Sequence, residues 1–210
     1  QERIADFLIA PDSERLIAAR AAWRDARRAW QHAEVFNLVA QTGHPLAGDP
    51  LRSWAVNRID PWPIKADFIH RIIGSSSGED ASLYALTQSN LVALNDDENA
   101  ESSIIGFHAI EWLLWAGSGH SNSNTISTTG SSDSALVVAS LLEAFDPNVP
   151  ATHRRRRYLS LISDQLAGDV SHLNGAWNDG VEGYAAQLAS APANRALATI
   201  LEGLVMLLEH

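Results

Sequence analysis

The sequence predicts an all-α protein, a bundle of long antiparallel helices forming a single domain over residues 1–210. Three observations support this fold class. Apolar side chains recur at three- and four-residue spacing over long segments, and alternating β-type patterning is essentially missing. Hydrophobic residues make up 46% of the chain, which is enough to build a large helical core.

The first long helix is predicted over residues 14–40, where an apolar stripe recurs with helical spacing. The stripe consists of Trp23, Ala26, Trp30 and Ala33, and the arginines between them, Arg27 included, are expected to lie away from it. Prolines and glycines predict a loop over residues 42–62. Shorter helices are then expected at 64–73, 82–95 and 102–116.

A Gly/Ser/Thr/Asn tract at about residues 117–134 predicts a flexible surface loop inside the domain. A helix is expected at 135–145, followed by a turn in which Thr152 is a plausible N-cap. The next helix is predicted over 153–173 and the last over 194–208. The four arginines at 154–157 are expected on a solvated face, with some of them paired to acids elsewhere because a helix N-terminus disfavours positive charge.

Composition excludes several classes of function. The formal net charge of −10 argues against a nucleic-acid partner, whose phosphates would be repelled. No apolar run reaches the roughly 18–20 residues that a transmembrane helix requires, and no signal peptide is visible in the chain. There is no cysteine, so a thiolate metal site is impossible. The motifs H-E-x-x-H, E-x-x-H and G-x-x-x-x-G-K-[ST] are all absent.

The segment "IIGFHAIEWLLWAG", residues 104–117, holds two polar side chains within an apolar helix. His108 and Glu111 are three residues apart, so they lie on the same helix face, and a buried carboxylate there needs a partner. One interpretation is an internal hydrogen bond that orders the core. The other is a cation held by nitrogen and oxygen, a donor set that suits iron, zinc, copper or manganese.

Two further observations favour the cation. Glu34 places a carboxylate on the apolar stripe of the first long helix, and Gly106 indicates a close backbone approach beside the histidine. Asp60, in "RIDPWPIKADF", is a weaker candidate, because an aspartate before a proline is usually a turn or cap residue. The other histidines, His70 among them, are scattered without ligand spacing and are expected at the surface.

The residues "GFHAIEWLLW" contain a G-x-H-x-x-E signature as Gly106, His108 and Glu111, and the segment resembles the imelysin-like proteins, peptidase family M75. "AARAAWRDARRAWQHAEVF" resembles that family's first long helix and "IDPWPI" its aspartate-tryptophan-proline loop. Longer members have two helical bundles, and this chain is similar to the first.

The resemblance implies a helical-bundle protein of the bacterial periplasm or outer cell surface that takes part in iron acquisition with a membrane partner. His108 and Glu111 would match the family's HxxE metal pair, and Glu34 and Asp60 its additional acidic ligands. Iron is the first expectation for the metal and zinc the second.

Two alternatives stay open. An M75-type metallopeptidase would use the same site, with Glu34 or Asp60 as general base and an open coordination position for water. A purely structural His–Glu pair would only organise the core.

Overall fold

The computed structural model describes residues 1–39, 58–74, 84–96, 103–115, 135–178, 180 and 183–208. Over these residues the regular secondary structure is helical, without a β-strand. An isolated parallel bridge between Ile64 and Ser103 is the β-type contact among them. The predicted all-α fold class is therefore confirmed.

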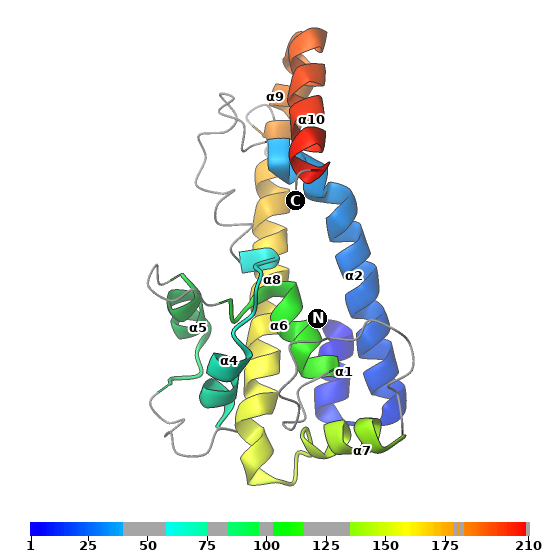
Figure 1. Cartoon of the computed structure of the whole chain (residues 1–210), viewed down its shortest axis with the longest axis vertical. Coiled ribbons are helices and arrows are strands. Elements are labelled where there is room, and N and C mark those ends of the chain that lie inside the picture. The colour runs from blue at the N-terminus through cyan, green and yellow to red at the C-terminus, as the bar shows by residue number, and fades with distance from the viewer. Residues whose placement is uncertain are drawn as a thin grey trace.

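Two long helices, α2 (Ser13–Val39) and α8 (His153–Asn178), frame the molecule. In Figure 1 the colour of both helices advances from bottom to top, so the two run in the same direction. The short helix α1 (Glu2–Ile9) runs against α8, because the residue before α1 contacts the middle of α8 and the last turn of α1 contacts its first turns. Antiparallel packing thus applies to shorter neighbours rather than to the two longest helices.

Helix α6 (Gly106–Trp115) lies between α2 and α8 and forms the centre of the core (Figure 1). It is apolar on nearly every side, and a helix of this kind must be covered all round. Its buried residues are Gly106, Phe107, Ala109, Ile110, Trp112, Leu113 and Leu114. The buried helix predicted over 102–116 is confirmed, with its start four residues later.

The remaining helices are shorter. They are α4 (Ala66–Ile73), α5 (Gln88–Asn95), α7 (Ala135–Glu143), the 3-10 turn η2 (Pro150–Thr152), α9 (Tyr184–Ser190) and α10 (Ala193–Leu208). Both α4 and α5 pack against α8, and α10 packs against α2. None of the described helices combines the length and apolarity that crossing a membrane requires.

Local hydrogen bonds explain where the helix boundaries differ from the predictions. Helix α5 begins at Gln88 rather than at residue 82, because the Thr87 side chain accepts from the Asn90 amide and caps the first turn. Thr152 occupies the N-cap position of α8, as predicted, but its hydroxyl donates to the carbonyls of Asp146 and Val149 instead of accepting from the first turn of the helix. The predicted loop at 117–134 and most of the loop at 42–62 lie outside the described residues.

The arginine run at the start of α8 forms the predicted solvated face only at Arg157, which is exposed. Arg154 donates to the carbonyls of Ile72 and Tyr84, at 2.8–3.0 Å, and Arg156 donates to the carbonyl of Phe145 at 2.7 Å. Arg155 is buried. Arg154 and Arg156 contact backbone carbonyls of other segments, so they join α8 to its neighbours.

His70 also differs from its predicted surface position. Its ring packs edge-on against Trp112 of α6, with the ring centroids 4.8 Å apart. Burial, with a smaller effect from the Arg155 charge, lowers the pKa of His70. The side chain is therefore half-buried, with one edge of its ring packed on the core.

Candidate functional site

The first turn of α6 is held against the segment before it by a close backbone contact. Gly106 has φ +81°, in the region that favours glycine. A Cβ there would lie 2.6 Å from the carbonyl oxygen of Ile59 and 2.8 Å from that of Arg58. The close approach predicted from this glycine is confirmed, and it sets residues 58–61 directly beside the histidine helix.

Further contacts hold the Asp60 loop in place. The Ser103 hydroxyl donates to the Pro61 carbonyl at 3.1 Å, and the Lys65 amide donates to the Ser103 carbonyl at 3.1 Å. On the other side, Arg58 pairs with Asp96 at the end of α5, its Nε 3.1 Å from Oδ2. Asp60 thus sits in a loop that is fixed on both sides.

His108 and Glu111 contact each other as their spacing predicts. The Nδ1 atom of His108 lies 3.1 Å from Oε2 of Glu111, with the geometry of a hydrogen bond. Their side chains are 20% and 18% exposed, so both reach the edge of the core. The pair is therefore partly buried and still within reach of solvent.

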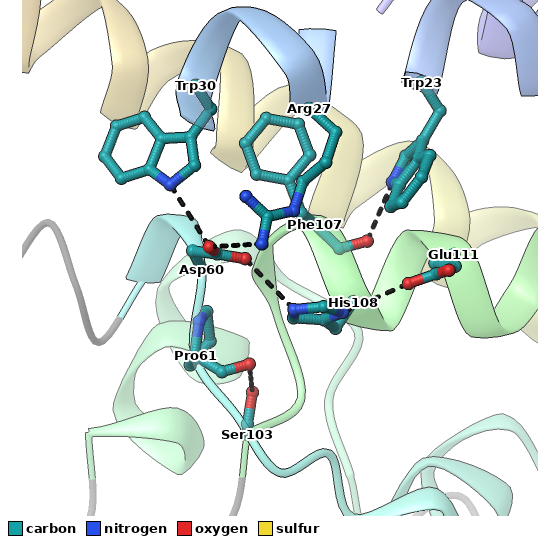
Figure 2. Close-up of polar contacts among 9 residues, drawn as sticks. All are labelled: Trp23, Arg27, Trp30, Asp60, Pro61, Ser103, Phe107, His108 and Glu111. Atoms are coloured by element: carbon teal, nitrogen blue, oxygen red, sulfur yellow. Dashed lines mark hydrogen bonds and ion pairs between the residues drawn. The ribbon is translucent and has the colours of Figure 1, made fainter. Parts of the chain in front are cut away.

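Asp60 lies at the opposite end of the imidazole (Figure 2). Its Oδ1 is 3.2 Å from Nε2 of His108, while its Oδ2 is 2.8 Å from the Arg27 guanidinium and accepts from Trp30 Nε1 at 3.2 Å. The side chain is 11% exposed. The interpretation of Asp60 as a turn or cap residue was wrong, because its carboxylate points inward and contacts two helices.

One oxygen of Asp60 is left without a hydrogen-bond donor. Oδ1 is buried and close to Nε2 of His108, but the two atoms are not oriented as a hydrogen bond. A buried polar atom without a partner costs about 1–3 kcal/mol, and more when it is charged. The contact of Oδ1 with the imidazole is thus an ion pair without hydrogen-bond geometry, and a cation bound between the two atoms would satisfy Oδ1 better.

The charges around the imidazole favour its protonated form. Burial lowers the pKa of His108, but the carboxylates of Asp60 and Glu111 outweigh burial and raise the pKa to about 9. Without a bound cation the histidine therefore carries a proton at neutral pH. The positive charge of the imidazole then balances the two carboxylates, which a metal ion could do in its place.

Three aromatic or basic residues at the site were not predicted. Arg27 was expected off the packed stripe of α2, but its side chain is only 17% exposed and lies over the Phe107 ring. Trp30 was expected as a packing residue, and its indole N–H also bonds Asp60. Trp62 packs against the His108 ring with centroids 4.9 Å apart. The sequence feature that could have indicated Arg27 is its spacing from Trp30: the two residues are one turn apart on α2 and therefore share a helix face.

The predicted ligand set does not converge on one point within the part of the chain that is described. Asp60 and Glu111 face different nitrogens of the same ring, and no group of three His, Asp or Glu side chains is placed to hold a metal ion among these residues. Glu34 belongs to α2, one turn after Trp30, but its side chain lies outside the described residues. The four-residue ligand set therefore stays a prediction.

Comparison with known protein families agrees with the G-x-H-x-x-E signature. The family model Peptidase M75 (imelysin) matches residues 1–210, the whole chain. The chain belongs to the imelysin family. Searches of the curated proteins and of the solved structures found no match. Membership indicates a peptidase M75-like or iron-related protein, while the roles of its individual residues rest on the geometry above.

Proposed function

We propose that this imelysin chain binds iron, or another divalent cation such as zinc, at His108 and Asp60, and that it serves iron acquisition in the bacterial periplasm or at the outer cell surface. One observation carries the proposal. A buried carboxylate oxygen that lacks a hydrogen-bond donor lies 3.2 Å from a histidine nitrogen. A cation bound to both atoms would satisfy them together.

The separation of the two donor atoms supports this assignment. Neighbouring ligands of a metal ion bound at roughly 2.0–2.2 Å lie about 3 Å apart, close to the observed distance between Oδ1 and Nε2. Imidazole nitrogen and carboxylate oxygen together suit iron and zinc. The net charge of −10 also raises the local concentration of cations around the protein.

Further ligands would come from α2 and from water. Glu34, one helical turn after Trp30 on α2, is the further protein ligand that we expect, and water would complete the set. His108 keeps 20% of its side chain exposed, which leaves a route from solvent. A metal ion bound here would act as a charge that neutralises the acids.

A peptidase would need, in addition to the metal, a carboxylate free to take a proton from water. The two carboxylates described at the site already have partners. Oδ2 of Asp60 contacts Arg27 and Trp30, and Glu111 is hydrogen-bonded to the His108 ring. Binding therefore ranks above hydrolysis. If the metal-loaded protein cleaved an unfolded substrate such as casein, and Glu34→Gln abolished cleavage while keeping the metal, the ranking would be reversed.

Calorimetric titration of chelator-treated protein with Zn²⁺, and with Fe²⁺ under anaerobic conditions, tests the proposal. His108→Ala and Asp60→Asn should each weaken binding at least tenfold, because each removes a direct ligand. His32→Ala and Asp25→Asn, which alter exposed residues of α2, are matched controls and should bind as wild type does. Lack of binding by the wild type, or wild-type affinity in His108→Ala, would overturn the proposal.

A further inference from the structure

We propose that Glu111 is not a ligand of the cation but a positioning residue, which holds His108 so that Nε2 faces Asp60 and the cation lies between Nε2 and Oδ1. This inference rests on the proposed function and divides the G-x-H-x-x-E signature into two roles. The histidine binds, and the glutamate orients it.

The two contacts of the imidazole differ in kind. The contact between Nδ1 and Glu111 is a hydrogen bond at 3.1 Å within one helix, so its geometry is fixed by α6 itself. The contact between Nε2 and Asp60 has a similar length but lacks hydrogen-bond orientation, which leaves Oδ1 without a donor. A ring nitrogen that donates to a carboxylate leaves the other nitrogen as the metal-binding atom.

A single cation cannot use both ends of the ring. Figure 2 shows Asp60 and Glu111 at opposite ends of the imidazole, and the lone pairs of the two nitrogens point away from each other. A cation at Nδ1 would displace the Glu111 hydrogen bond and would leave Oδ1 of Asp60 unsatisfied. A cation at Nε2 keeps that hydrogen bond and satisfies Oδ1.

Only one oxygen of Asp60, Oδ1, faces His108 and could bind the cation. Arg27 and Trp30 both bind Oδ2, and together they hold the carboxylate with Oδ1 toward His108. Trp62 packs against the imidazole, which limits rotation of the ring. The site therefore supplies Nε2 of His108 and Oδ1 of Asp60 at a fixed separation, while Glu111 binds Nδ1 on the other side of the ring.

Nuclear magnetic resonance of Zn²⁺-loaded protein carrying ¹⁵N-labelled histidine reads the arrangement directly. We expect the His108 signals of a zinc-bound Nε2 and a protonated Nδ1, whose proton exchanges slowly with water. In Glu111→Ala the same proton should exchange rapidly. Zinc on Nδ1 in the wild-type protein would overturn the inference and leave the proposed function standing, whereas no zinc bound at all would overturn both.

Affinities measured with Zn²⁺ separate orientation from ligation. Glu111→Gln keeps an oxygen that can accept from Nδ1, so its affinity should stay within a few-fold of wild type. Glu111→Ala should lose about 10–100-fold, the usual cost of removing a residue that orients a metal ligand. Asp60→Asn should lose more than Glu111→Gln. Equal losses in Glu111→Gln and Asp60→Asn would show that Glu111 is itself a ligand.

Discussion

The stability of the metal-free protein should fall as the pH rises through the alkaline range, because of His108. Burial lowers the pKa of this histidine, but Asp60 and Glu111 outweigh burial and raise the pKa from 6.5 to about 9 in the folded protein. The folded state therefore binds the proton more tightly than the unfolded chain does. The stabilisation is fully present below pH 6.5 and is lost as the pH approaches and passes 9.

The magnitude follows from the size of the shift. The pKa difference between folded and unfolded states is 9 − 6.5, or about 2.5 units, and each unit corresponds to about 1.4 kcal/mol. The protonated imidazole thus stabilises the fold by about 3 kcal/mol. The His108 side chain is 20% exposed, so solvent screens this interaction only partly.

Urea unfolding in the presence of a chelator, at half-unit steps from pH 6 to 9.5, measures the effect. His108→Gln is the reference, because it retains a polar side chain that does not titrate. The free energy of unfolding of the wild type minus that of the variant should shrink by about 3 kcal/mol across this range. If the difference stays constant with pH, the two carboxylates do not hold a proton on His108 and the charge argument for the site is wrong.

Three further predictions concern the supports of the site. Gly106→Ala should destabilise the fold by roughly 2 kcal/mol or more in urea unfolding, because the residue has a positive φ and lies against two carbonyl oxygens. The control Gly168→Ala, on α8 with open space around it, should be neutral or slightly stabilising. Equal effects of the two would contradict the close contact. Tyr158→Phe should cost about 1–3 kcal/mol, because its buried hydroxyl donates to the Ile104 carbonyl just before α6, and no loss would mean that this carbonyl finds another donor. Zn²⁺ at 100 times its dissociation constant should stabilise the wild type by about 2.7 kcal/mol and leave His108→Ala unchanged, which a thermal melt would verify.

Helical periodicity predicted the parts of the structure that depend on local sequence. The apolar surroundings of His108 predicted a buried helix, and the three-residue spacing predicted its contact with Glu111, because both follow from the geometry of one helix. Gly106 predicted a close backbone approach, because a glycine inside a helical pattern costs stability, but it did not indicate that the partner is the Arg58–Ile59 backbone. The start of α5 was missed, since the Thr87 cap competed with a continuous helical pattern.

Contacts between distant segments were beyond the sequence pattern. Asp60 meets Trp30 across thirty residues of chain, and apart from the resemblance of its loop to the imelysin family, its local pattern is that of an ordinary turn aspartate. The acceptors of Arg154 and Arg156 are backbone carbonyls, which every residue has, so no side-chain pattern indicates them. Long-range polar contacts of this kind depend on how the helices pack, which the sequence does not display.

Helix α2 holds α6 at both ends. Trp23 donates to the carbonyl of Phe107 at 2.9 Å, and Arg20 donates to the carbonyl of Leu114 at 3.0 Å. These carbonyls are about 10 Å apart along the helix axis, so the two bonds together fix both the position and the rotation of α6 on α2. Neither sliding nor turning of α6 against α2 can occur while both bonds persist. His108 consequently stays in register with the side chains of α2. Loss of the Arg20 bond at the end of α6 would therefore affect the position of His108 at its start.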